Sequence, residues 1–162
     1  MRFILPAIAL AALAAGPATA QEKVPSAAHV LESLDACMTV VDAEWIELNE
    51  LRSLGYDNAR AKARNNRTRS VRGLYQKAGN PAIIIMSKAE LDEKHCVVSA
   101  ALAQTADYIP LAQEVSQTLG MPVSQDGAAY FWAKDDRRIK IEPEGDAEKP
   151  FARFTVSVAD AD

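Results

Sequence analysis

The two cysteines, Cys37 and Cys96, are the first residues in this chain that could carry chemistry. Neither belongs to a C-x-x-C motif, which argues against a thiol-redox enzyme. Both fall at positions that the hydrophobic pattern predicts to face a core, in a chain that begins with an export signal. We therefore predict a disulfide between Cys37 and Cys96, with two buried free thiols as the alternative.

The two histidines, His29 and His95, are the next candidates. A protein metal site needs three or four convergent ligands, and no further ligand stands at a suitable spacing from either histidine. The glycines form neither a phosphate loop nor a dinucleotide fingerprint. We expect solvated or hydrogen-bonded imidazoles, and we expect no metal and no cofactor.

Recognised nucleophile motifs are missing from the sequence, including G-x-S-x-G and S-x-x-K. The adjacent acids Asp92-Glu93 and Asp135-Asp136 fall in predicted turns, where acids commonly serve solubility. The sequence therefore assigns no catalytic residue, and this favours a binding protein over an enzyme.

A basic segment, residues 57–80, carries seven cations against the single acid Asp57, in a chain whose formal charge is −4. If its first half is helical, Arg60, Arg64 and Arg67 lie on one face and form an anion-binding patch for an acidic envelope component or an acidic partner protein. The alternative is internal pairing with acids of the first helix. These acids are Glu44, Glu47 and Glu50.

A helical region is predicted at the N-terminal side of the basic segment. Ser26 can cap a helix, and apolar residues then recur at steps of three and four. The β-branched pair before Asp42 predicts a break, and Gly55-Tyr56 ends the region. In the basic segment we expect two short helical pieces and a loop, because Asn65-Asn66 is poor helix material. The apolar residues are Val30, Leu34, Cys37, Met38, Val41, Trp45 and Leu48.

The central part of the chain predicts two strands, residues 83–86 and 95–99, and a helix over residues 108–119. Asp107 and Pro110 mark the start of this helix, while Gly120 and the proline two residues later mark its end. We expect the strands and the helix to make a core.

The last forty residues predict an antiparallel hairpin and one further strand. A turn over residues 124–127 leads into strands 128–134 and 137–142, joined by Asp135-Asp136. That turn pairs Trp132 with Ile139 and Tyr130 with Ile141. Pro143 is expected to end the second strand, followed by a charged loop (144–150), a strand (151–158) and a frayed tail (159–162).

The order of elements predicts an α+β fold: an N-terminal helical region, then β-β-α-β-β-β. Period-two alternation in the last strands predicts an antiparallel sheet with helices covering one face, which makes two layers held by one disulfide. The 142 residues after the export signal suit a single domain, residues 21–162.

Residues 1–20 have the pattern of a bacterial signal peptide, with cleavage expected between Ala20 and Gln21. The mature chain would then be a periplasmic protein. Loss of Arg2 changes the formal charge from −4 to −5, which does not suit general nucleic-acid binding, and no second stretch is long enough to cross a membrane.

These observations predict a non-enzymatic protein that binds an envelope component or a partner. The alternatives are a small hydrolase with an unrecognised site, or an inhibitor of an envelope enzyme that inserts the loop Glu144 to Pro150 into its target.

Overall fold

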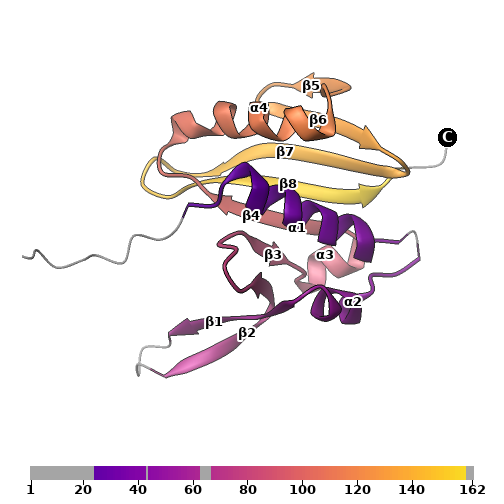
Figure 1. Ribbon diagram of the computed structural model, residues 1–162, viewed down its shortest axis with the longest axis vertical. Coiled ribbons are helices and arrows are strands. Elements are labelled where there is room, and N and C mark those ends of the chain that lie inside the picture. The colour runs from indigo at the N-terminus through magenta and orange to yellow at the C-terminus, as the bar shows by residue number, and fades with distance from the viewer. Residues whose placement is uncertain (1–23, 43, 63–66, 160–162) are drawn as a thin grey trace, which may run out of the picture.

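The computed structural model describes residues 24–42, 44–62 and 67–159. In these residues four helices accompany one antiparallel sheet of order β1-β2-β3-β4-β8-β7-β6-β5 (Figure 1). The helices are α1 (Ala27–Val40), α2 (Leu48–Ser53), α3 (Lys88–Asp92) and α4 (Tyr108–Leu119). The strands are β1 (Tyr56–Lys62), β2 (Thr68–Lys77), β3 (Ile83–Ile85), β4 (Cys96–Ala101), β5 (Ser124–Asp126), β6 (Ala129–Lys134), β7 (Arg137–Gly145) and β8 (Pro150–Val158).

The N-terminal helical region breaks where the sequence predicts. Ser26 caps α1, and His29 completes a reciprocal capping box with it. The helix ends at Val40, and Val41 then forms an isolated bridge with Ile46 before α2 begins. β-branched residues fit this extended connection better than a continued helix.

The predicted helical connector over residues 57–80 is wrong, because most of the segment is the hairpin of β1 and β2 (Figure 1). Tyr56 and Tyr75 are almost fully buried and hold the base of this hairpin in the core. Backbone pairing to β3, through Leu74 and Tyr75, fixes the segment as sheet. These long-range contacts outweigh the weak local helix signal.

The predicted hairpin of β6 and β7 is confirmed in its register. Trp132 pairs with Ile139 and Tyr130 with Ile141, around a two-residue turn in which Asp135 has a φ of 55°. Aspartate tolerates this left-handed conformation better than most residues.

Two details of this part of the chain differ from prediction. Ser124–Asp126 is a short strand, β5, instead of a turn. Pro143 does not end β7, since it pairs with Ala152 and the strand continues to Gly145. The β6 ladder ends where Tyr130 meets Ile141, so no β6 residue is paired with the proline.

Helices α1 and α4 cover one face of the sheet (Figure 1). On β8 the residues Ala152, Phe154 and Val156 are fully buried toward this face. Arg153 lies on the opposite face, where its guanidinium meets the Glu90 carboxylate of α3 at 3.4 Å. The α+β fold with a helix-covered antiparallel sheet is therefore confirmed.

The predicted disulfide is confirmed and joins Cys37 of α1 to Cys96 of β4. The two Cα atoms lie 5.4 Å apart, and 59 positions separate the cysteines in the sequence. Both residues are fully buried. The bond therefore ties the covering helix directly to the middle of the sheet.

Both ends of the chain carry predictions that lie outside the described residues. The expected signal, residues 1–20, is outside them, as is the tail beyond Ala159. The Ala159 amide donates a hydrogen bond to the Asp136 carbonyl at 2.8 Å. Within the described ranges, no helix has the length and apolar character needed to span a membrane.

Candidate functional site

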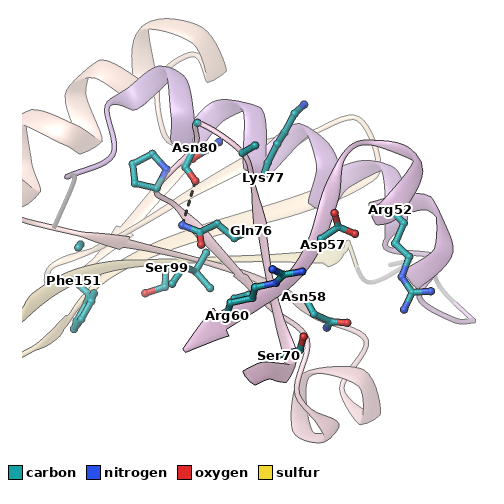
Figure 2. Close-up of a pocket in the computed structure, with 16 residues that line it drawn as sticks. Arg52, Asp57, Asn58, Arg60, Ser70, Gln76, Lys77, Asn80, Ser99 and Phe151 are labelled. Atoms are coloured by element: carbon teal, nitrogen blue, oxygen red, sulfur yellow. Dashed lines mark hydrogen bonds between the residues drawn. The ribbon is translucent and has the colours of Figure 1, made fainter. Parts of the chain in front are cut away.

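A groove of about 1040 Å³ lies between the β1–β2 hairpin and the sheet face that α1 and α4 leave uncovered. Figure 2 shows hairpin residues on one side of it, with Ser99 of β4 and Phe151 of β8 on the other. Its lining residues are Arg52, Asp57, Asn58, Ala59, Arg60, Ser70, Gln76, Lys77, Ala78, Gly79, Asn80, Pro81, Ile83, Ser99, Ala101 and Phe151. Polar and apolar surface contribute about equally to this lining, and its charged residues are three cations and one carboxylate.

One end of the groove is formed by the segment around Asn80, a residue that is only 3% exposed. Its side-chain amide donates to the His29 carbonyl at 2.9 Å and to the Glu32 carboxylate at 2.8 Å. Its side-chain oxygen accepts a hydrogen bond from the Ala82 amide at 2.9 Å. These bonds hold the segment between β2 and β3 against α1.

Lys77 is the groove cation that already has an internal partner. Its ammonium meets the Glu32 carboxylate at 2.9 Å and lies 5.7 Å from the centre of the Tyr56 ring. The hydrogen bond to Glu32 raises the pKa of Lys77, and the bonds from Lys77 and Asn80 lower the pKa of Glu32. Lys77 therefore stabilises one side of the groove through its ion pair with Glu32.

Arg52 and Arg60 are the other two groove cations, and both side chains are exposed. Among the ion pairs of the described residues, none involves either of them. Figure 2 shows Arg60 beside Asn58 and Ser70, so an amide and a hydroxyl accompany this guanidinium. Such a set of donors suits a carboxylate or phosphate oxygen.

The outer half of the hairpin carries a further cation, Lys62, on the same face as Arg60. Arg60 pairs across the strands with Ser70, and two residues further on Lys62 pairs with Thr68. Alternation along a strand places Arg60 and Lys62 on the same face. Arg69 is paired with Ala61 and therefore lies on the opposite face.

The two described arginines of the predicted patch, Arg60 and Arg67, do not lie on a helix. Arg60 lies in β1 and lines the groove, and Arg67 lies immediately before β2. Arg64 lies outside the described residues. The helical spacing does not apply to Arg60, because β1 is extended and has a side-chain period of two.

The alternative of internal pairing with Glu44, Glu47 and Glu50 receives no support for Arg60, which makes no ion pair with them. Arg52, Ser70 and Ser99 line the groove but were not predicted as site residues. The pair Arg60 and Lys62, spaced by two, was the available signal for a strand with one basic face.

The remaining candidates are accounted for locally. His29 belongs to the cap of α1, and His95 lies 3.3 Å from the Glu93 carboxylate at the surface. The described residues contain no group of three or more potential metal ligands. Asp136 pairs with Arg137 beside the β6–β7 turn.

The predicted loop at Glu144 to Pro150 is a tight turn. Strand β7 continues to Gly145 and pairs there with Pro150. The Asp146 carboxylate accepts hydrogen bonds from the Glu148 amide at 2.9 Å and the Lys149 amide at 2.8 Å.

A second, apolar hollow of about 380 Å³ lies beside α4. Its neighbourhood includes Met121, which is 84% exposed, and Ile109, which is 44% exposed. Its lining contains no charged residue. This hollow therefore differs in chemistry from the basic groove.

Comparison of the chain with protein-family models, with curated proteins and with solved structures gives no match.

Proposed function

We propose that this chain is an exported, periplasmic, non-enzymatic protein that binds an anionic envelope component or an acidic partner protein. The proposed site is the groove beside the β1–β2 hairpin, with Arg60 as its principal anion-binding side chain. Arg52 contributes a second positive charge at the rim.

The observation that carries this proposal is an exposed guanidinium with polar neighbours in a groove. Arg60 lies with Asn58 and Ser70 in the lining, and no described carboxylate forms an ion pair with it. Lys77, by contrast, is held by Glu32. A cation that the fold does not neutralise favours an external anion.

The composition of the groove favours binding over hydrolysis. The hydrolase alternative calls for two carboxylates or a histidine converging in a cleft. Asp57 is the single carboxylate among the groove residues, and neither described histidine belongs to the lining. The lining instead offers amides, hydroxyls and guanidinium groups, which are hydrogen-bond donors for anions.

Export is supported by two independent features. Residues 1–20 have a short apolar run and a small-residue cleavage pattern before Gln21. The disulfide between Cys37 and Cys96 is typical of an oxidising compartment. Intact mass of the protein purified from the periplasm should match a chain that begins at Gln21; a full-length chain in the membrane fraction would contradict export.

The binding site is tested by retention on polyanions at low and moderate salt. The probes are phosphatidylglycerol vesicles, polyphosphate and polyglutamate. We expect the wild type to be retained on at least one of them at low salt and Arg60→Gln to be retained several-fold less.

Arg69→Gln is the matched control, because it removes the same charge from the opposite face of the hairpin. Thermal unfolding should be the same for both variants, since exposed charges contribute only about 0–1 kcal/mol. Absence of wild-type retention on every probe, or equal losses in the two variants, would contradict the proposed site.

A further inference from the structure

Strand β1 is one of the two edges of the eight-stranded sheet, and it is the longer one. It pairs with β2 on one side, and no strand of the described residues lies on the other. Its outer half, Arg60 to Lys62, is exposed. Figure 1 shows this end of the hairpin extending away from the helices and the rest of the sheet. An edge of this kind presents backbone groups that can pair with another extended chain.

The charge of this edge selects the kind of chain that can pair with it. Arg60 and Lys62 point to one face, and Arg69 on β2 points to the other. A second copy of the same hairpin would bring like charges together, which disfavours self-association. An acidic strand would instead be attracted to this edge, because its carboxylates would lie beside the cationic side chains.

The base of the hairpin is held by the core, so the edge is formed before any ligand arrives. Tyr56 and Tyr75 are buried, and the Tyr56 hydroxyl is hydrogen-bonded to Ser33 at 3.1 Å. Gly73 accepts a hydrogen bond from the Met86 amide at 2.7 Å. A preformed edge lowers the entropic cost of binding.

The other edge of the sheet does not offer the same surface. Strand β5 spans only Ser124–Asp126, and its one charged residue is the acid Asp126. An acidic ligand would be repelled there. The two edges therefore differ in both length and sign of charge.

We infer that β1 binds an extended acidic polypeptide segment by strand addition, with the carboxylates of that segment at alternating positions. Backbone hydrogen bonds to β1 supply the pairing, and Arg60 and Lys62 meet the side chains that point toward the groove. Near Asp57 the segment carries a neutral or basic residue, since a carboxylate there would face a like charge.

This inference rests on the proposed function, and it narrows the anion to a polypeptide. A lipid phosphate or a polyphosphate could satisfy Arg60, but it has no amide groups to pair with a strand edge. Because side chains alternate between the two faces of a strand, the ligand must carry its carboxylates at every second position to face both Arg60 and Lys62. A test must therefore separate charge from backbone pairing.

The test uses three synthetic peptides of about the length of β1, which has seven residues. In the first peptide glutamate alternates with threonine. The second has the same composition with its glutamates in one block, and the third is the first with its internal amides N-methylated. Binding to the mature, oxidised protein is followed by fluorescence anisotropy.

We expect the alternating peptide to bind about tenfold more tightly than the block peptide and the N-methylated peptide. Arg60→Gln with Lys62→Gln should weaken binding of the alternating peptide about tenfold. Arg69→Gln with Arg138→Gln removes the same charge from other surfaces and should leave binding within about twofold.

Equal binding of the alternating and N-methylated peptides would overturn strand addition. If polyphosphate or vesicles are retained through Arg60 while the alternating peptide does not bind, the inference fails and the proposed function stands. If no anion binds at all, both fail. The peptide comparison uses the wild-type protein, so it remains decisive even if a hairpin variant unfolds.

Discussion

Asn80 is a buried polar side chain whose hydrogen bonds connect three parts of the chain. It donates to His29 and Glu32 of α1, and it accepts from the Ala82 amide ahead of β3. We expect Asn80→Ala to lower the free energy of unfolding by about 1–3 kcal/mol, because buried partners lose their hydrogen bonds.

Urea denaturation provides the measurement for Asn80→Ala, and Gln76→Ala is the control. Gln76 also lines the groove, but its side chain is exposed and reaches only the Asn80 carbonyl at 3.5 Å. The control should change the free energy of unfolding by no more than about 0.5 kcal/mol. Equal effects of the two substitutions would argue against the Asn80 network as a structural element.

The ion pair of Glu32 and Lys77 predicts a pH dependence of stability. Hydrogen bonds from Lys77 and Asn80 lower the pKa of Glu32 below its ordinary value of 4.5. A lowered carboxyl pKa stabilises the fold above the unfolded-state value, and this contribution is lost as the pH falls through the folded-state value.

We expect Glu32→Gln to be less stable than the wild type at neutral pH and to approach it below about pH 4. Thermal unfolding across that pH range measures the difference between the two proteins. Glu93→Gln is a control, because Glu93 lies at the surface with His95. A constant difference between wild type and Glu32→Gln at every pH would contradict the ion pair as its cause.

At the scale of elements, the β1–β2 hairpin depends on a close backbone approach at Gly73. This glycine has a φ of 78°, and a Cβ placed on it would lie 2.9 Å from the Met86 carbonyl oxygen. The strand register also shifts near this point, between Asn58 and Arg60 of β1. A side chain at position 73 must therefore displace β2 from the segment after β3.

We expect Gly73→Ala to lower the free energy of unfolding by about 2–4 kcal/mol, since backbone strain and a backbone clash add together. Gly79→Ala is the matched control, because Gly79 has a φ of 84° and open space around its Cβ position. It should cost only about 1 kcal/mol. Equal losses in urea denaturation would show that the contact with Met86 contributes nothing.

At the scale of the whole molecule, the disulfide connects the helical layer to the sheet. It closes a loop of 59 positions between Cys37 and Cys96. In the chain-entropy treatment, a loop of this size corresponds to roughly 4 kcal/mol of stabilisation. We expect the double variant Cys37→Ala with Cys96→Ala to lose about 2–5 kcal/mol.

Denaturant unfolding of the oxidised, reduced and double-variant proteins measures this loss. The oxidised wild type should yield no thiol on labelling under denaturing, non-reducing conditions. The reduced protein should resemble the double variant. Two labelled thiols in protein purified from the periplasm would contradict the bond in that compartment.

The distribution of charge also belongs to the whole molecule. Seven cations and one acid are gathered in residues 57–80 of a chain whose formal charge is −4. The fold turns the described part of this segment into one hairpin at the edge of the sheet (Figure 1). A linear charge cluster thus becomes a surface, with Arg60 and Lys62 on one face.

Local sequence patterns were sufficient for a large part of this fold. The boundaries of α4 follow from its first-turn proline and the glycine at its end, and the β6–β7 register follows from a two-residue turn with alternating apolar residues. Two cysteines at inward positions, together with an expected export signal, predicted the Cys37–Cys96 bond. The helix and hairpin signals come from residues that are close in sequence. The disulfide could be predicted because the chain has two cysteines, so each has one possible partner.

The hairpin of β1 and β2 and the groove beside it were decided only by tertiary structure. The two-residue spacing of Arg60 and Lys62 was the only local signal for this strand, and its extended form comes from pairing with β2 and from anchoring at Tyr56 and Tyr75. The groove joins residues 52–60 to Ser99 and Phe151, which no short-range pattern can bring together. Strand pairing is non-local, so its energy appears only when distant segments meet.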